Sequence, residues 1–290
     1  EGDIDKIKNF LKSKIPNNKN NKDPFFVYFH SFEFLDDLQE LSNENLRIHG
    51  RKLVNSWIDQ NNSWKSKTWD DFILATRICN WIKNYNFFFS TADDLFKKKF
   101  FISIIRQIEH LVKNFSNLKK NSYLIRIIKA LIYVSITIPE KKYYYQIAIF
   151  NLKTELNRQI LNDGCHFQRN PIIHVQVLID LLDIRSILIS QKKNVFFDLQ
   201  NAIKNMSIAY RFFLHKDNSL ANFNGSNNFN QKKLKNIISE IPKLKKNPRE
   251  LQDSGFHRVD TKDTTLIVDC GIPKNYDATY AILTTNQRTA

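Results

Sequence analysis

The chain has 290 residues, of which 42% are hydrophobic, and it contains only six Gly, seven Pro and three Cys. This composition excludes a collagen-like protein, a linker and a disulfide scaffold, and a chain of this length and apolar content can bury a sizeable core. With 44 Lys and Arg against 29 Asp and Glu, the net charge of +15 indicates either a polyanionic partner or a compositional excess of Lys, which accompanies frequent Asn, Ile and Phe.

The first segment, residues 1–24, is polar and ends in a run of Asn and Lys, so it is predicted to be a solvated lead-in. No signal peptide is visible in it. The densest apolar run, residues 124–138, is interrupted by Arg126 and Lys129, and it falls short of the roughly 18–20 apolar residues of a membrane-spanning helix. We therefore expect no transmembrane segment.

An aromatic segment, residues 25–38, follows. Its large apolar side chains must be buried against a larger part of the protein. Helical periodicity then dominates over residues 44–214. One apolar face is formed by Ile104, Ile108, Leu111, Val112 and Phe115. Further helices are predicted at residues 44–60, 67–86, 122–138, 142–161, 172–191 and 197–214. Helices of this length with short connections pair antiparallel, so the pattern predicts an all-α array of helical hairpins.

Local signals support these helix ends. Residues 68–71 (Thr-Trp-Asp-Asp) are typical of an N-cap followed by acidic residues in the first helical turn. Pro139 should end the helix before it. The four tryptophans are expected to pack in the core rather than to stack on sugar rings: Trp57, Trp64, Trp69 and Trp81.

The pattern changes after Pro242, where a basic joint leads into two short β-type runs. The runs, residues 254–259 and 264–269, flank a polar turn and predict a β-hairpin. About 40 residues are present from here on, whereas a sandwich needs roughly 100. The sequence thus predicts a lead-in (1–24), a helical domain (25–245) and the truncated start of a β-sandwich (250–290).

Residues 156–174 contain the highest density of side chains that can bind a ligand or transfer a proton. A helix is predicted to stop at residues 163–164, and Pro171 opens the next. The loop and the following first turn supply two imidazoles, a guanidinium and an amide: His166, Arg169, Asn170 and His174. Such a group at a helix N-terminus suits a carboxylate-bearing ligand. The alternative is that these side chains cap the two helix ends.

The order of several fragments resembles the heparinase II/III family of polysaccharide lyases, in particular its alphaproteobacterial heparinase II/III-like branch. The fragments around the loop are residues 159–161, 163–164, 166, 169–171, 174 and 178–183. The others are residues 32–38, 77–82, 211–215, 220–225, 253–258 and 268–273. The resemblance covers residues 25–275.

The resemblance implies a fold, an incomplete (α/α) toroid followed by a β-sandwich, and an activity, the β-elimination of uronic-acid polysaccharides. This reaction needs a base for the proton α to the carboxylate and polar groups that neutralise that carboxylate. The catalytic candidates are His166, His174 and Tyr123, and the substrate-binding candidates are Arg169, Asn170 and Asn224. No cofactor or metal is implied, the expected partner is an acidic polysaccharide, and the expected location is the periplasm or cell envelope, with the cytoplasm left open.

Three departures from the family pattern affect this interpretation. Ile173 stands where active members carry a Tyr, residues 121–123 (Asn-Ser-Tyr) stand where they carry Gly-Asn-His, and residues 276–290 lack their His-Ala-Gly run. A catalytically silent glycan-binding or cell-envelope protein therefore stays open, as does a basic helical scaffold. Lys is spread along the chain without interleaved Arg and aromatic residues, which argues against nucleic acid.

Overall fold

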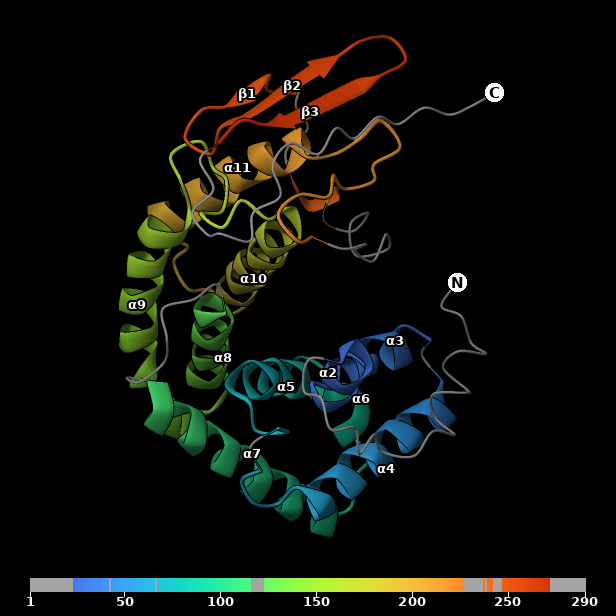
Figure 1. Ribbon diagram of the computed structural model, residues 1–290. Helices are drawn as coiled ribbons and strands as arrows, with labels where there is room; N and C mark the ends of the chain where they lie inside the picture. Colours follow the sequence, from blue (N-terminus) through green and yellow to red (C-terminus); the bar gives the residue numbers. More distant parts are fainter. Residues whose placement is uncertain are drawn as a thin grey trace. The chain divides into compact units, whose positions relative to one another are not determined.

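The computed structural model describes residues 23–271, apart from residues 42, 66, 116–122, 227–236, 238 and 242–246. The described part is mainly helical and carries one small antiparallel sheet, which confirms the predicted fold class (Figure 1). It divides into two compact units, Glu1–Ala148 and Ile149–Ala290. None of the helices described is long and apolar enough to cross a membrane.

The first unit is built from helices around a central α5. They are α2 (Pro24–His30), α3 (Phe34–Glu40), α4 (Glu44–Gln60), α5 (Asp71–Lys83), α6 (Tyr85–Phe89), α7 (Asp94–Phe115) and α8 (Leu124–Thr137), followed by the 3-10 turn η1 (Pro139–Lys141). Asp70 caps α5 by accepting hydrogen bonds from the backbone N–H groups of Phe72 and Ile73, and α8 ends two residues before Pro139. The predicted helix end before Pro139 is confirmed, whereas α5 begins at Asp71, four residues after the predicted start at residue 67, and its N-cap is one of the acids expected in the first turn. Helix α5 packs against α7 and α8.

A buried arginine holds the core of this unit together. Arg77 is 0% exposed, its Nη1 donates to the carbonyl oxygens of His30 (2.8 Å) and Thr68 (2.9 Å), and its Nε donates to Gln107 Oε1 (2.6 Å). The guanidinium lies 4.2 Å from the ring centre of Trp57. In the part of the chain described, no carboxylate pairs with Arg77. Hydrogen bonds to neutral oxygens and an aromatic face therefore hold this charge.

Aromatic rings fill the same core. Phe32, Trp57 and Trp81 are each 0% exposed and meet edge to face, with ring centroids 5.3–5.7 Å apart. Trp69 is also buried, so three of the four tryptophans pack as expected. Trp64 differs because it lies in the loop between α4 and α5 and is 61% exposed.

Helix α9 (Tyr144–Gln159) contains the division between the units, and the second unit continues with α10 (Pro171–Ser190) and α11 (Phe197–Phe212). Its sheet has the order β1 (Glu250–Leu251), β2 (Phe256–Asp260), β3 (Thr265–Asp269), with Arg258 opposite Ile267. The predicted hairpin is confirmed as β2 and β3, and β1 is an added strand.

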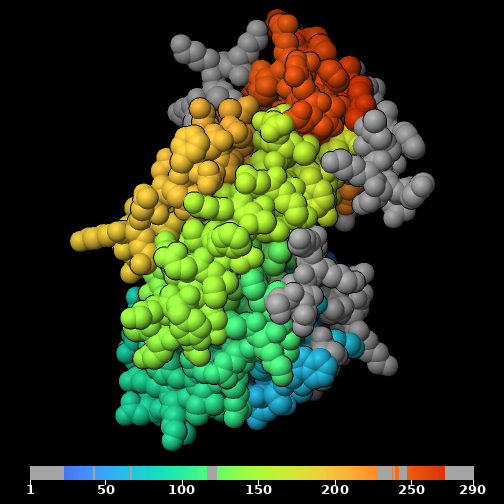
Figure 2. Space-filling model, turned by 90° about the vertical axis from the view of Figure 1, so that its left-hand side faces the viewer, coloured from blue at the N-terminus to red at the C-terminus, as the bar shows by residue number. Residues whose placement is uncertain are grey.

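The sheet covers the C-terminal end of α11 (Figure 1 and Figure 2). The ring of Phe256 on β2 is 0% exposed and lies 5.0 Å from that of Phe213 and 5.3 Å from that of Phe223. The sheet thus belongs to the same compact unit as α10 and α11. The domain bounds expected from composition stay a prediction.

Candidate functional site

The loop between α9 and α10 folds back on itself. Helix α9 ends at Gln159, earlier than the predicted residues 163–164, because Ile160 and His166 form a β-bridge that replaces the last helical turn. Gly164 then turns the chain with a φ of 83°, and a Cβ there would lie 2.2 Å from the carbonyl oxygen of Asn205 on α11. Only glycine fits both the backbone angle and this close approach.

His166 is buried inside this loop, with 0% of its surface exposed. Its Nε2 lies 3.1 Å from Gln159 Oε1, and its Nδ1 accepts a hydrogen bond from the backbone N–H of Gln168 (3.3 Å). Gln159 donates its own amide to Glu155 (2.6 Å), which leaves Oε1 as the acceptor for His166. The network therefore assigns the proton to Nε2. Burial, then the neighbouring imidazole of His174, lowers the pKa of His166 to about 3.

His174 lies in the first turns of α10 and is also 0% exposed. Its Nδ1 accepts from the backbone N–H of His166 (3.2 Å), and its Nε2 donates to the carbonyl oxygen of Met206 (2.9 Å). Burial lowers the pKa of His174 to about 4. Both imidazoles are thus neutral near pH 7, and all four ring nitrogens have partners within the protein.

The two histidines should make the protein sensitive to mild acid. Because each pKa is lower in the folded chain than the roughly 6.5 of an unfolded chain, the unfolded state binds more protons below that pH. The free energy of unfolding should therefore fall between about pH 6.5 and pH 4, with a slope of up to about 1.4 kcal/mol per pH unit for each histidine. Urea unfolding followed across this range measures the slope.

Two variants test the origin of that slope. His174→Gln should reduce it, whereas His257→Gln, at a largely exposed position on β2, should not. A slope that is unchanged in His174→Gln would contradict the assignment of a neutral, buried imidazole.

Arg169 binds a carboxylate that the protein itself supplies. It has a φ of 57°, its Nε donates to the carbonyl oxygen of Ser254 (2.8 Å), and its Nη2 pairs with Asp269 Oδ1 at the end of β3. The guanidinium lies 5.1 Å from the ring centre of Phe256. Both partners are buried, with 6% of each side chain exposed. Arg169 thus binds a carboxylate, but this carboxylate belongs to Asp269 of the same chain and not to a ligand.

The two asparagines belong to the same network. Asn170 is the N-cap of α10, since its Oδ1 accepts from the backbone N–H groups of Ile172 (2.9 Å) and Ile173 (3.1 Å). Its Nδ2 donates to the carbonyl oxygen of Asn224 (2.9 Å). Asn224 in turn donates to the carbonyl oxygen of Arg169 (2.9 Å) and to Asp269 Oδ2 (3.2 Å). The capping role weighed from the sequence is therefore present, and ligand binding by these side chains stays a prediction.

Three residues of this network were not predicted as site residues. Asp163 accepts hydrogen bonds from the backbone N–H (2.7 Å) and the hydroxyl (2.8 Å) of Ser254, and Asp269 receives Arg169 and Asn224. All three lie in the fragments that carry the family resemblance. That shared order was the signal that could have found them.

The structure brings five of the six predicted site residues together in the second unit. Tyr123, the sixth, belongs to the first unit, where it precedes α8, is 44% exposed and lies 4.6 Å from the ring of Phe72. Ile173 is partly buried in the first turn of α10. Residues 121–122 and 276–290, which depart from the family pattern, lie outside the described residues.

Solved structures similar to this chain are polysaccharide lyases. A structure of heparinase III matches with a TM-score of 0.67 and 14% identity over 86% of this chain and 45% of its own. A mutant of the heparan sulfate lyase HepC from Pedobacter heparinus matches with a TM-score of 0.64 and 15% identity over 95% of this chain and 49% of its own. These similarities show the fold.

The sequence is also similar to that of a bacterial protein. FtsZ-localized protein C of Caulobacter vibrioides is 23% identical over 249 residues, which are 86% of this chain and 43% of that protein. The chain therefore spans less than half the length of the relatives named here. The family model described as Heparinase II/III N-terminus matches residues 51–252, which is more than half of the chain. The chain thus belongs to the heparinase II/III family, whose predicted resemblance is confirmed.

Proposed function

We propose that this chain recognises an acidic polysaccharide on a heparinase II/III-type fold and does not cleave it through the cluster of residues 163–174. One observation carries the second half of this proposal: every ring nitrogen of His166 and His174 is hydrogen-bonded inside the protein. A general base needs a lone pair within reach of the proton that it removes. Neither imidazole offers one at the surface, because both are 0% exposed.

The groups that would neutralise a substrate carboxylate already bind groups within the protein. The charge of Arg169 is neutralised by Asp269, and Asn224 donates to the same carboxylate. A substrate carboxylate would have to displace Asp269 from both groups. Ile173, where active family members carry a Tyr, can neither donate nor accept a proton.

Two observations support recognition of an acidic glycan: the family to which the chain belongs and its positive net charge. The family contains polysaccharide lyases, and a net charge of +15 attracts polyanions through its long-range field. A location in the cell envelope stays a prediction.

A second candidate function is β-elimination with Tyr123 as the base. The observation in its favour is that Tyr123 is the predicted catalytic residue with an exposed side chain, at 44%. In this case activity would depend on Tyr123 and would not depend on the buried histidines.

An elimination assay separates the two functions. The 290-residue chain is incubated with a panel of uronic-acid polymers, and the ultraviolet absorbance of the unsaturated uronate product is followed, with heparinase III as the positive control. We expect no absorbance to develop. We also expect heparin to retain the chain at physiological salt more strongly than dextran sulfate of the same charge density does, because diffuse charge alone does not distinguish two polymers that are charged alike.

Two results would contradict the proposal. An absorbance increase that is lost in Tyr123→Phe would establish the second candidate function. Equal retention on heparin and on dextran sulfate of the same charge density would show that the excess of Lys is compositional and that the glycan is not recognised.

A further inference from the structure

Three large apolar side chains are exposed around the connection between α10 and α11, residues 191–196. Ile189 at the end of α10 is 60% exposed, Phe197 at the start of α11 is 77% exposed, and Phe150 on α9 is 72% exposed. We refer to these three residues as the apolar tip. One exposed apolar side chain is common on its own, whereas a group of them indicates a surface that something else covers.

Helix α9 and the start of α11 lie side by side at the apolar tip. Lys153 follows Phe150 by one turn on α9. Its Nζ lies 5.2 Å from the ring centre of Phe196 and 3.8 Å from Asp198 Oδ2, the two residues that flank Phe197. Figure 2 shows the start of α11 in gold, standing out from the surface beside α9 in lime green. The apolar tip thus lies on a projecting part of the second unit.

The needs of the two helix ends do not explain the residues found here. Phe196 is the N-cap of α11 and makes no side-chain capping hydrogen bond, although Ser, Thr, Asp and Asn are preferred at this position. Lys192 has a φ of 52° at the end of α10, where glycine is usual. Its N–H donates to the carbonyl oxygen of Ile189 (3.0 Å), and that of Lys193 donates to the carbonyl oxygen of Leu188 (2.8 Å). An aromatic and a cationic side chain therefore replace the residues that end helices best.

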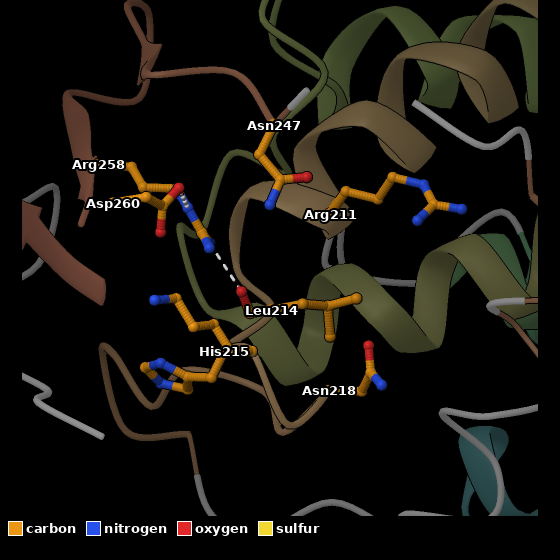
Figure 3. A pocket seen from close by; sticks show the side chains of 8 residues that line it. Arg211, Leu214, His215, Asn218, Asn247, Arg258 and Asp260 are labelled. Carbon is orange, nitrogen blue, oxygen red and sulfur yellow. Dashed lines mark hydrogen bonds and ion pairs between the residues drawn. The ribbon is translucent and has the colours of Figure 1, made fainter. Parts of the chain in front are cut away.

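The opposite end of α11 is covered by the protein itself. Arg258 on β2 donates to the carbonyl oxygens of Phe212 (2.5 Å) and Leu214 (2.7 Å), so the sheet caps this end (Figure 3). At a rise of about 1.5 Å per residue, Phe197 and Phe212 lie about 23 Å apart along the helix. The sheet therefore does not reach the apolar tip.

Positive charge borders the apolar tip. Lys192 is exposed in the connection, and Lys204 is exposed two turns after Phe197 on the same face of α11. The nearby carboxylate of Asp198 is balanced by Lys153. Protein interfaces are depleted in Lys, whereas apolar side chains bordered by Lys suit an anionic bilayer, because the amines stay at the level of the phosphates. The charge pattern therefore favours a lipid surface over a protein partner.

We propose that the apolar tip binds an anionic lipid surface. The rings of Phe150 and Phe197 enter the headgroup region, and Lys192 and Lys204 face the lipid phosphates. The chain then lies on the bilayer through one projecting part of the second unit. This binding does not depend on the proposed glycan recognition, since a phospholipid bilayer contains no polysaccharide.

Sedimentation of the whole chain with sucrose-loaded vesicles at physiological salt tests this proposal. One set of vesicles contains phosphatidylcholine and phosphatidylglycerol, and the other contains phosphatidylcholine alone. We expect stronger binding to the anionic set. The double variant Phe150→Gln and Phe197→Gln should lower the partition coefficient on that set about tenfold or more, because two apolar side chains no longer leave water. Val259→Thr is the control: it removes apolar character from an exposed residue of β2 and should leave binding unchanged.

The lysines provide the second readout. Lys192→Gln and Lys204→Gln should each lower binding to the anionic vesicles by about fivefold and change binding to the neutral vesicles little. Three results would overturn the proposal: no binding to either set, which would leave the apolar tip to a protein partner; equal binding to both sets; or a loss in Val259→Thr as large as that in the double Phe variant. The vesicles contain no glycan and the polymer assays contain no lipid, so each proposal can fail without the other.

Discussion

Replacing Arg169 with Met should lower the free energy of unfolding by about 3–5 kcal/mol, because it leaves the buried carboxylate of Asp269 without its cation. The variant also removes the donor to Ser254 O and the cation above the ring of Phe256. These contacts hold the sheet against the loop between α9 and α10. The loss should therefore appear as unfolding of the whole second unit.

Far-ultraviolet circular dichroism in urea measures this change, since the second unit contains helices α10 and α11 and none of the four tryptophans. Combining Arg169→Met with Asp269→Leu should recover much of the lost stability, because no unpaired charge then remains buried. Lys153→Met is the control: it breaks an exposed pair with Asp198, in which each side chain is 49% exposed, and should cost less than about 1 kcal/mol. If Arg169→Met instead kept full stability and lost heparin retention, Arg169 would be a ligand-binding residue.

Replacing Arg77 with Ala should destabilise the first unit by about 3 kcal/mol or more, because it leaves a buried cavity and because three acceptors lose the hydrogen bond from Arg77. The acceptors are the carbonyl oxygens of His30 and Thr68 and the side-chain oxygen of Gln107. Burial, which lowers the pKa of Arg77 to about 9, acts in the opposite direction, since the charge is held away from water without a carboxylate. We expect the hydrogen bonds and packing to outweigh that cost.

Tryptophan fluorescence in urea reports this change, because all four tryptophans lie between residues 57 and 81 of the first unit. Arg77→Lys serves as the matched variant: it keeps a cation but not the planar fork, and should lose less stability than Arg77→Ala. A more stable Arg77→Met variant would show that the cost of burying the charge dominates.

The sequence predicted four helices to within two residues at each end. The predicted residues 44–60 coincide with α4, residues 122–138 and 172–191 differ from α8 and α10 by one or two residues at each end, and residues 197–214 differ from α11 only at the C-terminal end, by two residues. Helices α2 and α3 were not predicted as helices, because the aromatic residues of 25–38 occupy all sides and show no clear period. Their burial depends on the rings of Trp57 and Trp81.

At the candidate site, the sequence indicated what the side chains can bind but not which groups of the folded chain they contact. The residue types at 166–174 indicate a capped helix, which is present, and a partner with a carboxylate, which the structure supplies from within the chain. The sequence does not reveal that the carboxylate is Asp269, because the partner lies in a strand far along the chain. Burial of the imidazoles likewise depends on the contact of Gly164 with Asn205 and on bonds to α11, which no local pattern encodes.

The pairing of Arg169 with Asp269 also sets an order of events during synthesis. The two residues are 100 positions apart, and at the usual rate of about 5–20 residues per second a ribosome needs about 5–20 s to travel from one codon to the other. During that interval α10 and α11 have left the ribosome while the loop before α10 lacks its counter-charge and Phe213 lacks the ring of Phe256. The nascent chain therefore exposes a cationic, aromatic surface that a chaperone can protect until β3 has been synthesised.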